Sequence, residues 1–178
     1  MNIVILNGGA TQGSRTRGLA RTFEQALNKN DINVTFFDLG EHVLPVYNGS
    51  DEQYQLTSVK ALQSLTQEAD GFVICTPEYH NGMSGALKNA LDFLGSRQFR
   101  NKPTLIAAAA GGGKGGINAL NNLRTVMRGV YALVLPDQFV ADPHHFNDQQ
   151  KVTDYDAQER INGMAEELIR ISRLLAAK

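Results

Sequence analysis

The sequence predicts an α/β fold built on a parallel five-stranded sheet. Three observations support this prediction: short apolar runs rich in β-forming residues, helical patterns between them, and glycines clustered where the runs end. A chain that alternates strand and helix places helices on both faces of a parallel sheet, since each crossover is right-handed. With 178 residues the chain suits a single domain, residues 1–178, because a chain of this size buries about 70% of its unfolded surface.

Five segments are predicted as strands. The first, third, fourth and fifth are continuously apolar, which is typical of strands buried on both faces. Five strands are too few for the six-stranded dinucleotide fold but match the order 2-1-3-4-5, the flavodoxin-like three-layer α/β/α arrangement. The predicted strands are residues 3–6, 32–37, 72–75, 104–109 and 131–135.

Apolar residues spaced three and four apart predict five helices, the third of them at residues 84–94. The core-facing residues expected along the five helices, in chain order, are Leu19, Phe23, Ala26 and Leu27; Leu56, Val59 and Leu62; Met83, Leu87, Ala90, Leu91 and Leu94; Ile117, Leu120 and Met127; and Ile161, Met164, Leu168, Ile171 and Leu175.

Composition excludes several classes of function. Lys and Arg number 17 against 18 Asp and Glu, a net charge of -1, so the basic field that nucleic-acid binding requires is missing. One cysteine, Cys75, rules out an internal disulfide and a multi-thiolate metal site, and it suits a reducing, cytoplasmic compartment. The apolar run at the N-terminus is too short for a signal or membrane helix and is predicted to be the first strand.

The unusual residues follow the first, third and fourth predicted strands. In the order 2-1-3-4-5 the loops after these strands meet at the carboxyl edge of the sheet, where the strand order reverses. Ligands of open α/β sheets bind in that crevice. The sequence therefore predicts one small-molecule site made from three distant segments.

The first loop, residues 7–18, has the features of a phosphate site. Glycines let backbone amides approach an anion, hydroxyls add donors, and a helix begins nearby with free N–H groups. We prefer Arg15 over Arg17 as the charged partner, because it lies closer to the expected helix cap. No Gly-Lys-Ser/Thr follows, so the loop is not that of a nucleoside triphosphatase. In the alternative interpretation the glycines only turn the chain and Ser14 caps the helix. The candidate contacts are Gly9, Thr11, Ser14, Arg15 and Thr16.

The second loop, residues 77–82, offers backbone donors and one aromatic ring. These groups suit a planar heterocycle, although Tyr79 is equally compatible with a surface aromatic on a turn. A histidine without a carboxylate or nucleophile beside it is weak evidence for a general base, so backbone contacts are preferred for the neighbouring residues. The candidate contacts are Pro77, Glu78, Tyr79, His80 and Asn81.

The third loop contains Gly-x-Gly-x-x-Gly at residues 111–116. The motif follows the fourth strand, and too little chain remains after it for both halves of a Rossmann domain. A wall without side chains, against which a flat ring can lie, explains it better. The candidate contacts are Gly111, Gly112 and Gly113.

Together these motifs resemble the NADPH-dependent FMN reductase family and, within it, the azobenzene reductases. The resemblance covers nearly the whole chain. One departure concerns the first motif, where members often have Gly-Ser-x-Arg and this chain has Gly8-Gly9-Ala10-Thr11, leaving the phosphate charge to Arg15 or Arg17. The matching segments are residues 8–16 (GGATQGSRT), 76–92 (TPEYHNGMSGALKNALD) and 111–113 (GGG).

The resemblance implies tightly bound FMN, with NAD(P)H as co-substrate and no catalytic side chain. Hydride would pass from NAD(P)H to flavin N5 and then, in a second step, to a small acceptor such as a quinone, an azo compound or a flavin. It also implies a homo-oligomer, a dimer or tetramer. The helix at residues 84–94, with Phe93, Leu94 and Phe99, is a candidate for the subunit contact, although apolar residues at helical spacing more often face their own core.

Two rivals remain open, namely a flavodoxin-type electron carrier and a flavin-binding redox sensor without turnover. The preference between NADH and NADPH also remains open. Cys75 is interpreted as a core residue and Lys88–Asp92 as a surface ion pair. His144 and His145 are interpreted as part of a solvated loop, because adjacent histidines match no defined metal pattern.

Overall fold

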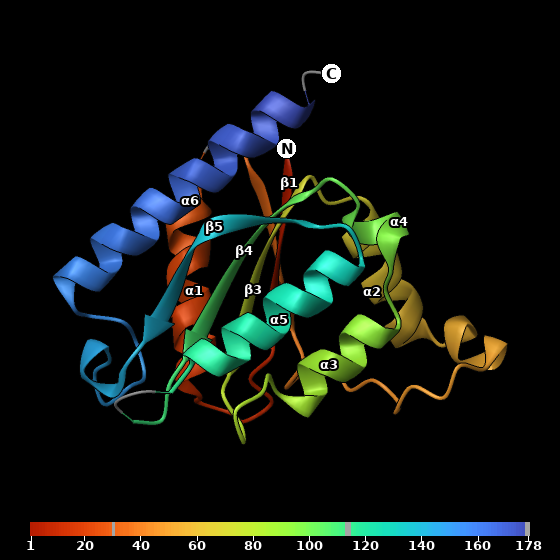
Figure 1. The fold of residues 1–178 in the computed structure, drawn as a ribbon, viewed down its shortest axis with the longest axis horizontal. Helices are drawn as coiled ribbons and strands as arrows, with labels where there is room; N and C mark the ends of the chain where they lie inside the picture. The colour runs from red at the N-terminus through yellow and green to blue at the C-terminus, as the bar shows by residue number, and fades with distance from the viewer. Residues whose placement is uncertain (30, 113–114, 177–178) are drawn as a thin grey trace.

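A computed structural model describes residues 1–29, 31–112 and 115–176. Its sheet has five parallel strands in the order β2-β1-β3-β4-β5 (Figure 1), which confirms the predicted flavodoxin-like topology. The strands are β1 (Asn2–Asn7), β2 (Asn33–Asp38), β3 (Gly71–Pro77), β4 (Pro103–Ala109) and β5 (Leu133–Ala141). The helices are α1 (Arg15–Leu27), α2 (Thr57–Gln67), α3 (Gly85–Asp92), α4 (Ser96–Phe99), α5 (Ile117–Gly129) and α6 (Tyr155–Ala176), with short 3-10 turns η1 (Asp51–Gln55) and η2 (Pro143–His145).

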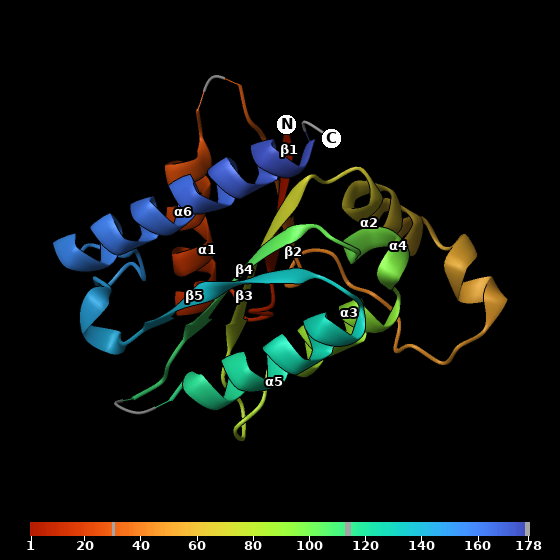
Figure 2. The ribbon, with the colours of Figure 1, turned by 45° about the horizontal axis from the view of Figure 1, so that its top comes forward.

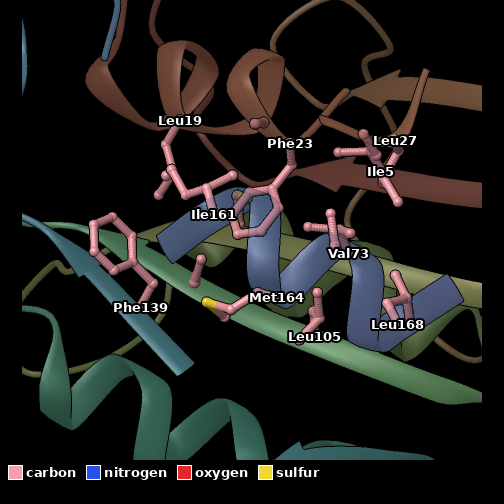
Figure 3. Packing of buried hydrophobic residues seen from close by; sticks show 14 of the residues in the cluster. Ile5, Leu19, Phe23, Leu27, Val73, Leu105, Phe139, Ile161, Met164 and Leu168 are labelled. Carbon is pink, nitrogen blue, oxygen red and sulfur yellow. The ribbon is translucent and has the colours of Figure 1, made fainter. Parts of the chain in front are cut away.

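Helices cover both faces of the sheet (Figures 1 and 2). Side chains alternate along each strand, so Ile3 and Ile5 of β1 join the core beneath α1 and α6, while Val4 and Leu6 join the core beneath α2, α3 and α5. Figure 3 shows the first core, in which Phe23 of α1 packs beside α6 over the sheet. These two cores hold the strand ends, and therefore the loops that follow them, in fixed positions.

The edge strand β5 differs from its prediction. It was expected at residues 131–135 as a run buried on both faces, but it begins at Leu133, continues to Ala141 and is partly exposed. Tyr131 has φ +64° and lies outside the strand. Pro136 concealed the continuation, because proline usually interrupts a strand; an edge strand with an irregular register tolerates it, and the register to β4 shifts between Thr104 and Ile106.

Most residues of the predicted helix faces are buried; Ala26, Ile171 and Leu175 are partly buried, and two residues are exposed. Leu56 is 44% exposed because it precedes the first turn of α2, and Ile117 is 45% exposed at the start of α5. Leu56 is the cap residue of α2 and Ile117 is the first residue of α5, so each apolar spacing runs to the exposed end of its helix. None of the helices within the described ranges is long and apolar enough to cross a membrane.

Of the candidate subunit contact, the three apolar side chains at the end of α3 and in α4 are contradicted by their burial, whereas the helix itself remains a prediction. Phe93, Leu94 and Phe99 are 2%, 8% and 0% exposed within this chain, so they cannot meet a partner without opening the core. The helix itself ends at Asp92, two residues earlier than predicted. The predicted pair Lys88–Asp92 is confirmed, with Nζ 2.7 Å from Oδ1.

Candidate functional site

The loops after β1 and β3 are bonded directly to one another. The Gly8 amide donates to the Cys75 carbonyl at 2.8 Å, and the Ser84 hydroxyl donates to the Gly8 carbonyl at 2.7 Å. A Cβ on Gly8 would stand 2.9 Å from the Cys75 oxygen and 3.0 Å from Leu87 Cβ. Only glycine therefore allows the two loops to approach this closely.

Ser84 has a second role that the sequence did not reveal. Besides bonding Gly8, its hydroxyl accepts from the Leu87 amide at 3.1 Å and so caps α3. One buried side chain thus begins the helix of the second loop and fixes the backbone of the first.

Side chains join the loop after β3 to the first turn of α5, the helix that follows the loop after β4. Glu78 Oε2 accepts from the Ala119 amide at 2.9 Å, and the Asn118 amide group donates to Asn81 Oδ1 at 3.1 Å. The three loops that were predicted to converge therefore do so, at one end of the sheet (Figures 1 and 2). Of the candidate residues, Gly113 lies outside the described residues.

Glu78 supplies a cap that α5 cannot provide for itself. The cap position is Gly116, which has φ +95°. A Cβ added there would lie 2.6 Å from Val140 Cγ1. No residue with a capping side chain fits there. The Glu78 carboxylate instead reaches the third amide of the helix from another loop, where the helix dipole also favours its charge. Its side chain therefore has a structural role, in addition to any backbone contact with a ligand.

Asn7 organises the phosphate loop, and sequence reasoning missed it. Its side chain is fully buried; Oδ1 accepts from the Gly9 amide at 3.1 Å, and Nδ2 donates to Asp38 Oδ1 at 3.1 Å. A polar residue that ends a continuously apolar strand, just before two glycines, was the available signal. The side-chain amide of Asn7 therefore joins the first loop to Asp38 at the end of β2.

Arg17 is held at the end of β2 by a buried ion pair. Its Nε donates to Asp38 Oδ2 at 2.6 Å, and the Arg17 and Asp38 side chains are 18% and 1% exposed. The hydrogen bond to Asp38 raises the pKa of Arg17 above its ordinary value, although burial opposes the shift. The Arg17 guanidinium therefore mainly neutralises Asp38, and Arg15 remains the better candidate to bind the phosphate of a ligand.

The first loop fits a phosphate. Nε of Arg15 and Nη2 of Arg17 are buried donors without a hydrogen-bond partner among the described residues, although Glu41 Oε1 lies 3.9 Å from Arg17 Nη2. An anion with several oxygen atoms is the kind of group that can satisfy such donors. Ser14 caps α1 by accepting from the Arg17 amide at 3.2 Å, as the plainer interpretation also predicts. A Cβ on Gly9 would meet Ser14 Oγ at 2.7 Å and Thr16 Cβ at 2.9 Å. These three candidates are thus in contact.

Thr11, the remaining candidate of this loop, differs from the others in its exposure. Thr11 is exposed, and no hydrogen bond of its side chain is found within the described part of the chain.

The second loop is a tight hairpin turn. Tyr79 and Gly82 exchange backbone hydrogen bonds of 2.9 and 3.0 Å, with His80 at φ +50° and Asn81 at φ +64°. This geometry matches a type I′ turn. The Tyr79 amide is therefore committed to the turn, its ring is 51% exposed, and Pro77 is buried at the end of β3.

The third loop has free space at its glycines. A Cβ on Gly111 or Gly112 would meet nothing within 4 Å, whereas one on Gly116 would collide with Val140. The packing of the chain therefore requires glycine at Gly116 but not at the first two positions. An open, side-chain-free surface at Gly111 and Gly112 fits a flat ring such as that of FMN.

The histidine pair His144–His145 is held by its own loop. His145 Nδ1 accepts from the Asp142 amide at 2.9 Å, so this ring serves the loop. Across the described ranges no three His, Cys, Asp or Glu side chains are grouped to hold a metal. His144 and His145 lie in the short 3-10 turn η2.

Cys75 is confirmed as a core residue, 0% exposed, and burial raises the pKa of its thiol. The thiolate is the reactive form. We therefore expect a thiol reagent such as Ellman's reagent to leave the native protein unmodified at neutral pH and to modify one thiol per chain in denaturant. Rapid modification of the native protein would show that β3 opens readily.

Residues 1–147 match the sequence model of the NADPH-dependent FMN reductase family. The chain belongs to this family. An NADPH azoreductase from Bacillus sp. (strain OY1-2) is 44% identical over 168 residues, which cover 94% of this chain and 90% of the relative. An FMN-dependent NADPH-azoreductase from Staphylococcus saprophyticus is 34% identical over 86% of this chain and 82% of its own. The resemblance inferred from the three motifs is thereby confirmed.

Solved structures of related architecture support the fold of this family member. The flavoenzyme NAD(P)H:(acceptor) oxidoreductase FerB from Paracoccus denitrificans superimposes with a TM-score of 0.78 at 20% identity, covering 97% of both chains. An FMN-dependent NADH-azoreductase from Bacillus anthracis, solved in complex with FMN, gives a TM-score of 0.69 at 14% identity, covering 94% of this chain and 99% of its own.

Proposed function

We propose that this chain is an FMN-dependent NAD(P)H oxidoreductase that reduces a small acceptor such as an azo compound, a quinone or a flavin. The observation that carries the proposal is the meeting of three loops at one sheet edge, with a phosphate-type loop at one side and bare glycines at the other. Family membership and 44% identity to an NADPH azoreductase support it.

The residues have distinct tasks in this proposal. Gly9, Ser14, Arg15 and Thr16, with Thr11, hold the cofactor phosphate at the start of α1. The turn from Pro77 to Asn81 borders the ring with backbone groups, and Gly111 to Gly113 leave one face of it open. Bound FMN supplies the hydride chemistry. The side chains named above hold and orient the cofactor, and none of them takes a covalent part.

An absorbance spectrum of the purified protein tests the cofactor, and anaerobic titration with NADH and NADPH tests the reaction. We expect a yellow protein that is bleached by the nucleotide and recoloured by an azo dye or quinone. Parallel lines in double-reciprocal plots are expected for two substrates that use one site in turn. A colourless protein that does not take up FMN would contradict the proposal.

The same measurements separate the two rivals. An electron-carrier flavodoxin would keep its colour when NADPH is added alone. Such carriers use strong negative surface charge for docking, and a net charge of -1 offers little. A redox sensor would be yellow but would show negligible steady-state oxidation of NAD(P)H in the presence of dye.

Replacing Gly111 with alanine tests whether this glycine matters for FMN binding and not for the stability of the fold. Because nothing lies within 4 Å of the added methyl group, the free energy of unfolding without FMN should change by less than about 0.5 kcal/mol. FMN affinity, measured by quenching of flavin fluorescence, should fall several-fold. Gly163→Ala, an equally open position on α6, is the control and should leave FMN affinity unchanged. Equal FMN affinity in the two variants would show that the ring does not lie against Gly111.

We further propose that residues 1–178 form one domain, that the protein is cytoplasmic, and that it assembles as a homodimer or homotetramer. The single cysteine supports a reducing compartment. Apolar side chains that a second copy can cover lie on the segment after β2, where Val43 and Val46 are 81% and 82% exposed. Sedimentation at micromolar concentration tests the assembly, and a monomer would refute it.

A further inference from the structure

Four asparagines are followed directly by glycine, namely Asn7, Asn48, Asn81 and Asn162. An asparagine in this position can lose its side-chain amide without an enzyme, because the backbone nitrogen of the glycine attacks Cγ of the asparagine. Glycine favours the reaction, since no Cβ hinders the approach of its nitrogen. The attack needs a backbone N–H that is not already bonded, so the folded structure decides which of the four dipeptides can react.

In three of the four dipeptides the glycine amide is bonded. Gly8 donates to the Cys75 carbonyl at 2.8 Å, and Gly82 donates to the Tyr79 carbonyl at 3.0 Å. Gly163 lies in the interior of α6, where backbone amides donate along the helix. Reaction at these three dipeptides therefore requires local unfolding to release the amide.

Asn48 differs from the other three because its glycine amide is free. Asn48 is exposed, and the segment between β2 and α2 to which it belongs runs along the edge of the molecule, away from α1 and α6 (Figures 1 and 2). The Gly49 amide has no hydrogen-bond acceptor among the described residues. Gly49 has φ +77°, and within 4 Å a Cβ there would meet the Tyr47 hydroxyl alone, at 3.9 Å. The attacking nitrogen is thus available without unfolding.

The side chain of Asn48 is also activated for attack. Its Oδ1 accepts from the Ser50 amide at 2.9 Å, an Asx turn that folds the side chain back over the Gly49 peptide. This bond draws electron density from Cγ, and the same N–H can stabilise the negative charge that develops on Oδ1. Asn7 makes a similar bond with the Gly9 amide at 3.1 Å, but its side chain is fully buried. Exposure and a free glycine amide therefore distinguish Asn48 from Asn7.

We infer that Asn48 is a site of spontaneous deamidation, the one among the four dipeptides that reacts in the folded protein. The Gly49 nitrogen gives its proton to a solvent base and bonds to Cγ of Asn48. The bond from Cγ to Nδ2 then breaks, and ammonia leaves. Water opens the cyclic imide at either carbonyl, which yields aspartate or isoaspartate at this position. No oxidant or cofactor takes part, so the inference is independent of the proposed function.

Deamidation changes both the charge and the backbone of this segment. It adds a negative charge two and three positions before the next acidic residues but one, Asp51 and Glu52. Isoaspartate also lengthens the main chain by a methylene group. Gln53 holds this backbone, because its Nε2 donates to the Val46 carbonyl at 2.7 Å and its Oε1 accepts from the Asn48 amide at 2.8 Å. We therefore expect the isoaspartate form to loosen the segment.

Peptide mapping by mass spectrometry, after the full chain is incubated at mildly alkaline pH, tests the inference. In the native protein Asn48 should convert about tenfold faster or more than Asn7, Asn81 or Asn162, because local unfolding limits the reaction at those three. In guanidinium chloride all four should convert at similar rates, since the fold no longer protects any of them. Native conversion of Asn48 no faster than that of Asn162, or a preference for Asn48 that persists in denaturant, would overturn the inference.

Two variants at the same position supply the controls. Asn48→Gln keeps an amide but lengthens the side chain, which disfavours ring closure. It should not accumulate the acidic form that ion-exchange chromatography resolves from the aged native protein, whereas Asn48→Asp should elute with that form from the outset. An acidic form that accumulates in Asn48→Gln as fast as in the unaltered chain would refute the assignment. Neither measurement uses FMN or NAD(P)H, so failure of the proposed function would not affect the result.

Discussion

Arg17→Met is expected to lower the free energy of unfolding by about 3 kcal/mol, the largest effect predicted here for a single side chain. The change leaves the Asp38 carboxylate, 1% exposed, without its cation. Asn7 and the Gly40 amide still donate to Oδ1, but Oδ2 loses the Arg17 partner. Urea unfolding measures the loss.

A double-mutant cycle identifies the cause. Asp38→Asn combined with Arg17→Met removes the buried charge, so the double variant should be more stable than Arg17→Met alone. Arg173→Met is the control; it breaks an exposed pair with Asp31, and such pairs contribute about 0–1 kcal/mol. If Arg17→Met and Arg173→Met cost the same, the pair with Asp38 is not a buried one in solution.

Glu78→Ala is expected to lower the free energy of unfolding by about 1.5 kcal/mol and to weaken FMN binding. About 1 kcal/mol reflects the lost bond to the start of α5, and the rest reflects the lost negative charge at the helix N-terminus. Without Glu78, only the bond from Asn118 to Asn81 still joins side chains of the second loop and the start of α5 among the contacts described above, so the third loop, which leads into that helix, is held less firmly. The Ala119 amide should exchange its hydrogen faster, and the Kd for FMN should rise.

Conservative and remote variants sharpen this prediction. Glu78→Gln keeps an oxygen acceptor and should restore most of the stability and FMN affinity. Glu159→Ala removes an exposed carboxylate from α6 and should change neither. Gly116→Ser cannot serve as a local replacement cap, because its Cβ would meet Val140 at 2.6 Å. Unchanged exchange at Ala119 in Glu78→Ala would show that the carboxylate does not hold the helix.

Patterns that depend on neighbouring residues could be predicted from the sequence. Continuously apolar runs identified β1, β3 and β4, since a strand covered on both faces needs apolar residues at every position. Alternation of strand and helix then gave the sheet order, and with it the meeting of the three loops. The error at β5 arose because an edge strand has no such pattern, and Pro136 concealed its length.

Contacts between distant residues could not be predicted in this way. Phe93 and Phe99 have the same spacing whether they face a partner or their own core, and only the packed structure placed them inside. The partners of Asn7 and Glu78 lie 31 and 41 residues away. A pocket between α1 and residues 149–153 likewise depends on a segment that returns more than a hundred residues later.

The sequence by itself determined the topology of the sheet, the family and the segments that form the site, because local hydrophobic periodicity and glycine positions specify strands, helices and the turns between them. Only the tertiary structure decided which arginine is tied to Asp38, which glycines serve packing and which leave room for a ligand, and which loop caps α5. Those outcomes depend on the distance between atoms far apart in the chain, which is set when the two cores pack.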